Sequence, residues 1–163
     1  MNTDNKSNRS NRTMFRHQHG QSMIEFALIL PLFVLFIIGV FELGRAFFSY
    51  IAITNAAREG ARVVTFWQGK ANFQNVRDAV INEVGTSPMV DKSKFDPILY
   101  PNSIVIRCGS GNPMPVVTTD AALKACPSEE PVRVTVTYPF DLILSFFFPQ
   151  PLKLVRSAEM MVP

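Results

Sequence analysis

The feature that most constrains this chain is an uncharged apolar run of sixteen residues, FALILPLFVLFIIGVF, from Phe26 to Phe41. A helix rises about 1.5 Å per residue, so this run covers ~24 Å, less than the ~30 Å hydrocarbon core of a bilayer. The helix is therefore expected to extend at one or both ends: backwards to Gln21, which draws Glu25 into or near the membrane, or forwards, which takes in Glu42 and Arg45. We therefore expect one long helix over residues 21–67, with its membrane span at about residues 23–45.

The charges around the run predict how the chain crosses the membrane. The first twenty residues contain one acid and four bases, so the whole formal net charge of +3 lies there. These residues are Asp4, Lys6, Arg9, Arg12 and Arg16. Basic residues that flank a membrane helix stay in the cytoplasm. We therefore expect a single-pass protein with residues 1–20 in the cytoplasm and its C-terminal domain on the other side.

Several other classes of protein fit the sequence poorly. A secretory signal peptide has an apolar stretch of about 7–15 residues, whereas this run is longer and is followed by Glu42 and Arg45. A nucleic-acid partner is not expected, because the net charge lies in the N-terminal tail and not on a folded domain. Both histidines lie at positions 17 and 19, and the cysteines lack CxxC spacing. We therefore expect no enzyme, no catalytic or metal site and no cofactor.

Three charged residues near the apolar run are candidates for functional residues. Glu25 lies beside the membrane span, where an unpaired carboxylate costs several kcal/mol. It is either a functional residue or an acid that reaches the interface in the first helical turn, where the helix dipole favours it. Glu42 and Arg45 are three residues apart and can pair on one helix face.

The helix is expected to continue beyond the membrane as an amphipathic helix. Apolar and small residues recur there at three-four spacing and predict one face that packs against a partner helix or the protein's own strands. These residues are Phe47, Tyr50, Thr54, Ala57, Ala61 and Val64. Gln68, Gly69 and Lys70 are expected to end the helix.

Residues 68–163 predict a small α+β domain. An apolar stripe predicts a second helix over residues 72–84, with Asn72 as its N-cap. Period-two alternation of Val and Thr predicts an antiparallel sheet of three or four strands. The three strand signals lie at residues 103–108, 132–138 and 152–158. A helix followed by such a sheet is typical of the α+β class.

The two cysteines, Cys108 and Cys126, lie on the translocated side, where disulfides persist. We expect them to pair across a seventeen-residue loop, which stabilises the fold by about 3 kcal/mol. Free or intermolecular thiols are the alternative.

The apolar segment 141–149 is too short to cross a bilayer. We expect one of three roles for it: it lies at the membrane surface, it forms a partner-binding patch, or it is a loop packed into the core.

Residues 20–26, GQSMIEF, resemble the class III signal of type IV pilins and pseudopilins: a Gly, four residues, then a Glu and an aromatic before an apolar helix. The longer segment 20–62 resembles the TadE-like family of the tight-adherence (Tad) pilus system. The residues that carry this resemblance are Glu25, Phe26, Ala27, Leu30, Pro31, Glu42, Leu43, Gly44, Arg45, Asn55, Ala56, Ala57, Arg58, Glu59, Gly60, Ala61 and Arg62.

The resemblance implies a pilin-like fold and a minor pseudopilin of a Tad/Flp pilus in a bacterial inner membrane, with a periplasmic domain. It implies cleavage by prepilin peptidase between Gly20 and Gln21, after which Glu25 can pair with the new α-ammonium group. The implied partners are prepilin peptidase, other Tad pilins and pseudopilins, the inner-membrane assembly platform and membrane lipid. The alternative is an uncleaved, single-pass envelope protein whose outer domain binds a partner or ligand.

Overall fold

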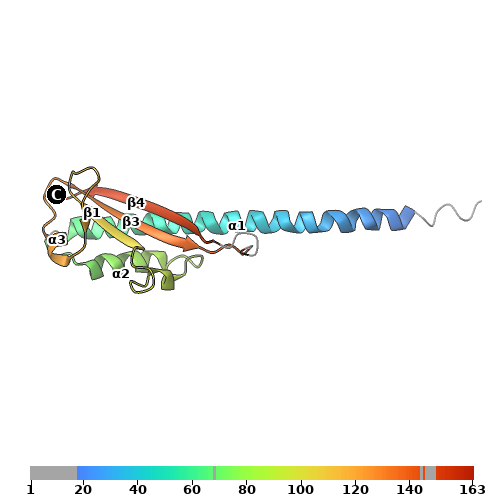
Figure 1. Cartoon of the computed structure of the whole chain (residues 1–163), viewed down its shortest axis with the longest axis horizontal. Helices are drawn as coiled ribbons and strands as arrows, with labels where there is room; N and C mark the ends of the chain where they lie inside the picture. The colour runs from blue at the N-terminus through green and yellow to red at the C-terminus, as the bar shows by residue number, and fades with distance from the viewer. Residues whose placement is uncertain (1–17, 68, 144, 146–149) are drawn as a thin grey trace, which may run out of the picture. The chain divides into compact units, whose positions relative to one another are not determined.

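The computed structural model describes residues 18–67, 69–143, 145 and 150–163 (Figure 1). The chain divides into two compact units, Met1–Phe41 and Glu42–Pro163, here called the N-terminal and the C-terminal unit. The element order is one long helix, a second helix, a 3-10 helix, two strands, a short helix and two further strands.

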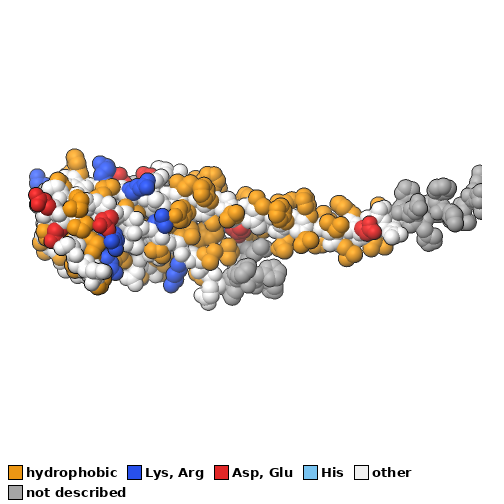
Figure 2. All heavy atoms as spheres, turned by 90° about the horizontal axis from the view of Figure 1, so that it is seen from above, with side chains coloured by type: hydrophobic (Ala, Val, Ile, Leu, Met, Phe, Trp, Pro, Cys, Tyr) orange, Lys and Arg blue, Asp and Glu red, His pale blue; other side chains and the backbone are white. Residues whose placement is uncertain are grey.

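Helix α1, Gln18–Phe66, begins in the N-terminal unit, where its surface is apolar on all sides from Phe26 to Phe41. From Met23 to Phe41, every large apolar side chain except the half-buried Ile38 is exposed. Figure 2 shows these hydrophobic side chains along the helix. Among the described residues, α1 is the one helix long and apolar enough to cross a membrane. A helix that is apolar all round and uncovered by protein suits a lipid environment.

In the C-terminal unit, α1 buries a face of small side chains. The buried residues of this face are Ala52, Ile53, Ala56, Ala57, Gly60, Ala61, Val63 and Val64. A Cβ atom added to Gly60 would lie 2.9 Å from Val80 Cγ2 and 3.1 Å from Val134 Cγ1. Gly60 therefore marks the point where α1 lies closest to both the second helix and the sheet.

The structure confirms the predicted second helix as α2, Phe73–Val84. The side chain of Asn72 accepts a hydrogen bond from the backbone N–H of Asn75 at 2.7 Å, which caps the helix. Val76, Val80 and Val84 are fully buried. The loop that follows contains a 3-10 helix, η1, Lys92–Phe95, which begins at the N-cap Asp91.

Four strands form one antiparallel sheet in the order β2-β1-β3-β4. The strands are β1 Ile104–Cys108, β2 Val116–Val117, β3 Pro131–Phe140 and β4 Leu152–Met161. Every second residue of β3 is buried, from Val132 to Phe140, and Val134 lies opposite Ala158 of β4. β4 is an edge strand, paired along its ten residues on one side by β3. The predicted α+β class is thus confirmed.

The face of α1 predicted to pack against a partner helix or the protein's own strands holds both exposed and buried residues. Phe47 is 61% exposed and Tyr50 is 38% exposed, whereas Ala57, Ala61 and Val64 are buried in the C-terminal unit. Packing of the exposed residues against a partner helix stays a prediction. Two short elements were not predicted: β2 and the helix α3, Asp120–Lys124, which Thr119 caps.

Candidate functional site

The residues of the predicted processing site lie in the first turns of α1. Gly20 is exposed, with open space where a Cβ atom would lie. Gln21 and Glu25 are exposed and four residues apart on the same helix, so their side chains lie on one face, one turn apart. Phe26 is also exposed, at 65%. The first turns therefore present the signal residues on an open helix surface.

A buried ion pair lies at the start of the C-terminal unit. Glu42 is 6% exposed, and its Oε2 accepts a hydrogen bond from Arg45 Nη1 at 2.7 Å. Its Oε1 accepts a second bond from the backbone N–H of Ile143, 101 positions along the chain. The Arg45 guanidinium lies over the ring of Phe140, 5.1 Å from its centroid. The pair therefore fastens α1 to the end of β3 and the residues that follow it.

Further polar contacts hold the loop after α2 against the same end of the unit. Ser49 is fully buried, and its hydroxyl donates to the carbonyl of Met89 at 3.1 Å. Lys94 Nζ donates to the carbonyl of Pro139 at 3.0 Å and to the carboxylate of Asp141. These contacts join α1, the loop and β3, so that Glu42 and Arg45 belong to a polar network at one end of the unit.

One carboxylate in this loop, that of Asp91, has a lowered pKa. Asp91 accepts hydrogen bonds from the hydroxyl and the backbone N–H of Ser93, at 2.8 and 2.9 Å. Hydrogen bonding to the hydroxyl and then to the N–H favours the ionised form, so the pKa of Asp91 lies below its ordinary value. The ionised side chain thereby caps η1.

The predicted family-motif residues near the end of α1 divide into two groups. Asn55 and Arg58 are exposed, whereas Gly60 is buried. Glu59 and Arg62 form a two-bonded ion pair with distances of 2.6 and 2.8 Å. The hydrogen bond from Arg62 lowers the pKa of Glu59, and the hydrogen bond to Glu59 raises the pKa of Arg62. Gly60 thus allows α1 to pack closely against α2 and the sheet, whereas Arg58, Glu59 and Arg62 lie on the outer side of the helix.

Cys108, at the end of β1, and Cys126, which follows α3, form the predicted disulfide, with their Cα atoms 5.9 Å apart. The bond joins the two ends of the segment 109–125, which contains β2 and α3. This segment pairs with the sheet at two positions, Ile106 with Val117 and Arg107 with Val116. The disulfide therefore supports a segment that has little sheet pairing of its own.

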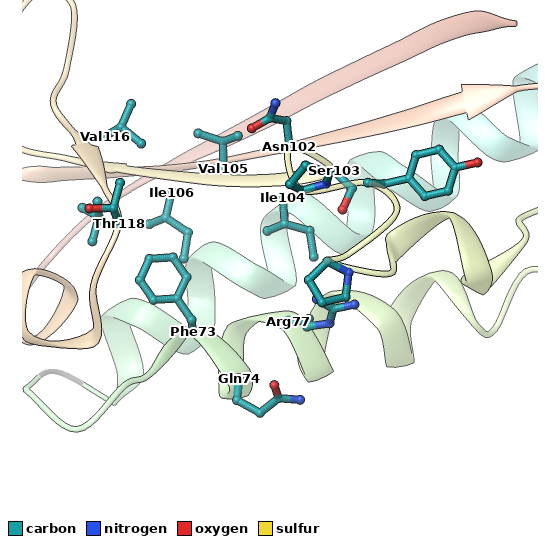
Figure 3. Close-up of a pocket in the computed structure, with 14 residues that line it drawn as sticks. Phe73, Gln74, Arg77, Asn102, Ser103, Ile104, Val105, Ile106, Val116 and Thr118 are labelled. Carbon is teal, nitrogen blue, oxygen red and sulfur yellow. The ribbon is translucent and has the colours of Figure 1, made fainter.

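A cavity of about 460 Å³ lies between α2 and the β1–β2 edge of the sheet (Figure 3). Figure 3 shows Phe73 and Arg77 of α2 pointing toward Ile106 and Ile104 of β1, whereas Gln74 points away from the strand. Arg77 is the one charged residue among the described residues that line it, and its guanidinium already donates to the carbonyl of Phe95. The described residues contain no cluster of His, Cys, Asp and Glu that could hold a metal ion.

The sequence predicted the Glu42–Arg45 pairing from its spacing, but not the groups that bury it. The Ile143 N–H, the Phe140 ring and the Ser49–Met89 bond join segments far apart in the chain. The apolar segment 141–149 was left with three roles; its residues 144 and 146–149 lie outside the described residues. Of its described residues, Leu142 packs against the core and Ile143 is 56% exposed.

Residues 20–62 match a protein family described as TadE-like protein. The match runs from Gly20 almost to the end of α1 and includes both ion pairs of the helix. It covers about a quarter of the chain and does not include α2 or the sheet. No curated protein and no solved structure matches the chain. The predicted TadE-like resemblance is thus confirmed for α1.

Proposed function

We propose that this chain, a TadE-like membrane protein by its residues 20–62, is a minor pseudopilin that assists assembly of a Tad/Flp-type pilus. The observation that carries the proposal is the coincidence of the TadE-like segment with a helix whose exposed surface is apolar from Met23 to Phe41. Such a helix fits a single-pass anchor. We propose the bacterial inner membrane as its location, with the N-terminus in the cytoplasm and the C-terminal unit in the periplasm.

Processing at the N-terminus is part of the proposal. Prepilin peptidase cuts between Gly20 and Gln21, and the cut removes the cytoplasmic leader with its net positive charge. The absence of a side chain at Gly20 lets the substrate backbone approach the protease closely. Unwinding of this first turn is favoured because helix ends fray and lack some intrahelical hydrogen bonds.

The cut also gives Glu25 a partner. Gln21 gains a free α-ammonium group one helical turn from the Glu25 carboxylate, on the same face of α1. In a low-dielectric setting, pairing with this group or with that of a neighbouring subunit offsets part of the cost of holding the carboxylate at the membrane. Pairing between subunits aligns them as they join the assembly platform and the other Tad pilins and pseudopilins.

The role proposed for the C-terminal unit is structural. The polar groups buried where this unit begins hold the fold together: Glu42 binds Arg45 and Ile143, and Ser49 binds Met89. The cavity beside α2 is lined by both apolar and polar residues, and its one charged residue among those described, Arg77, is already hydrogen-bonded. These observations support an assembly component over an enzyme.

The mass of the native protein tests the proposal. In a strain with active prepilin peptidase, the mature chain is expected to begin at Gln21, whereas Gly20→Val retains residues 1–20. Gly39→Val is the matched control, because Gly39 also lies in α1 with open space around it, and it should be processed normally. A full-length native chain in that strain would contradict the proposal and favour the uncleaved anchored protein.

Glu25→Ala tests the assembly step separately. The variant should be cleaved like the native chain but should be impaired in joining the pilus machinery, because the carboxylate that pairs with the α-ammonium group is gone. Cross-linking to other Tad components and pilus counts by electron microscopy measure the effect. Glu59→Ala, which removes a half-buried acid elsewhere on α1, serves as control. Normal piliation with Glu25→Ala would reject this role of the carboxylate.

A further inference from the structure

The exposed surface of α1 remains apolar after Glu42 and Arg45. In the next turns the large exposed side chains are Leu43, Phe47, Phe48, Tyr50 and Ile51, at 38–72% exposure. We call Leu43, Phe47, Phe48 and Ile51 the outer stripe. At 100° per residue these four lie within about 140° of one another around the helix. On the same side, the first exposed polar residues are Asn55, Arg58 and Arg62.

The polar groups within these turns face the protein. Glu42 is 6% exposed and binds the Ile143 N–H, and the Arg45 guanidinium lies over Phe140 with 24% of its side chain exposed. Ser49 is fully buried against Met89. In the sequence, Glu42 and Arg45 are typical of the end of a membrane span. In the structure, the C-terminal unit itself covers them, so they do not end the apolar surface.

The length of this surface fits a whole bilayer. Met23–Ile51 comprises twenty-nine residues of one helix, or about 42 Å at 1.5 Å per residue. The hydrocarbon core of a bilayer is ~30 Å thick, and the bilayer with its headgroup regions is ~40–45 Å thick. The outer stripe therefore has the length expected of the part of the helix that crosses the outer headgroup region.

We propose that the outer stripe lies in the interfacial layer of the lipid bilayer, so that the C-terminal unit rests on the membrane surface by this end. The inference relies on the membrane anchor proposed above. Lipid is the chosen occupant because the stripe directly continues the apolar surface of the span along α1.

Two side chains from other elements support a lipid contact at this end. Ile143, whose N–H binds Glu42, is 56% exposed. Leu152 lies opposite Phe140, the residue covered by Arg45, and is 50% exposed. Tyr50 adds an amphipathic ring of the kind enriched at membrane interfaces.

Site-directed tryptophan fluorescence in the full chain tests the depth of the stripe. The single native tryptophan, Trp67, is first replaced by Phe, and Phe48→Trp is then introduced. Phe48 is 59% exposed, so a larger ring there does not enter the core. The proteins are reconstituted in nanodiscs whose lipids are brominated close to the headgroup. We expect Trp at position 48 to lose most of its fluorescence and to resist quenching by aqueous acrylamide.

Two controls separate the possible outcomes. Phe33→Trp, measured in nanodiscs whose lipids are brominated near the ends of the acyl chains, reports the membrane span, and the native Trp67 reports a position beyond the polar residues of α1. If position 33 is not quenched by brominated lipid, the membrane anchor itself is rejected. If position 33 is quenched and position 48 is quenched only by acrylamide, the stripe lies in water. Protection of position 48 from both quenchers shows a protein partner or second copy there; either of these last results overturns the proposal. Phe47→Trp repeats the test at a second exposed position.

Discussion

Glu42 shows how strongly the contribution of an ion pair to the stability of the fold depends on its surroundings. The C-terminal unit has two Glu–Arg pairs with the same three-residue spacing on the same helix. In the Glu42–Arg45 pair the glutamate side chain is 8% exposed, whereas in the Glu59–Arg62 pair the side chains are 30% and 58% exposed. Only Glu42 also accepts a backbone bond from a distant segment. The first pair is therefore a tertiary contact and the second a local surface pair.

Glu42→Ala is expected to lower the free energy of unfolding of the C-terminal unit by about 2–3 kcal/mol, because it leaves the Ile143 N–H and the Arg45 guanidinium without their acceptor. Glu59→Ala removes an exposed pair of the same spacing and should cost less than ~1 kcal/mol. Denaturant unfolding in detergent micelles, followed by Trp67 fluorescence, measures both. Equal losses would mean that burial of the first pair adds nothing.

The sequence predicts the local half of this contact and not the distant half. Spacing alone places Glu42 beside Arg45, since residues three apart are neighbours on a helix. The N–H of Ile143 is a backbone group, and its role depends on where β3 ends relative to α1. Because every residue except proline has a backbone N–H, the sequence cannot show which one binds Glu42. This part of the contact is visible only in the three-dimensional structure.

At the scale of elements, α1 packs through small residues. Gly60 is buried near the C-terminal end of the helix, where an added Cβ atom would meet Val80 of α2 and Val134 of β3. Gly44, on the same helix, has open space at its Cβ position. Two glycines that look alike in the sequence thus have different roles: one permits close packing, and the other has room for a side chain.

Gly60→Ala is expected to destabilise the C-terminal unit by about 1–3 kcal/mol, because the added Cβ would lie 2.9 Å from Val80 Cγ2. Gly44→Ala should be neutral or stabilising by up to ~1 kcal/mol, since alanine is the better helix former. Thermal unfolding of the two variants beside the native chain tests this difference in sign. A stable Gly60→Ala variant would show that α2 and β3 shift readily to admit the methyl group.

The disulfide stabilises the segment between Cys108 and Cys126, which pairs with the rest of the sheet at only two positions. Replacing both Cys108 and Cys126 by Ala is expected to lower the free energy of unfolding by about 3 kcal/mol, because the seventeen-residue loop regains its freedom in the unfolded chain. Denaturant titrations with and without dithiothreitol measure the effect. The reductant should destabilise the native chain and leave the double variant unchanged; sensitivity of the double variant would point to another cause.

The elements predicted from the sequence are those with a long periodic pattern and the five-residue strand β1. The stripe of α2 and the alternation of β3 and β4 extend over ten or more residues and were predicted with the correct type. β2 has two residues, too few to show an alternation, and α3 has five, less than two turns of a helix. The three-four spacing on α1 predicted one face but could not say which of its residues are covered by the protein's own strands, because that depends on the tertiary packing.

For the whole molecule, the compact C-terminal unit begins inside α1. It comprises Glu42–Pro163, so the helix contributes its last twenty-five residues to the core of this unit. Ile53, Ala56, Ala57 and Ala61 are fully buried there. The residues after the helix therefore lack a large part of their core when α1 is removed.

A fragment of residues 42–163 is expected to unfold in one cooperative transition, whereas a fragment of residues 68–163 should show none, because its apolar sheet face has lost the helix that covers it. Circular dichroism against temperature, with mild detergent present for the exposed apolar side chains of α1, distinguishes the two. A cooperative transition in the shorter fragment would show that α2 and the sheet suffice as a folding unit.

The open side of β4 bears on how the protein avoids aggregation. A ten-residue edge strand is a template on which a foreign strand can add. Lys153, Arg156 and Glu159 place a charge at every third position along it, and a desolvated charge at the join makes such addition unfavourable. We therefore expect these three residues to disfavour intermolecular sheets where copies of the chain come close to one another.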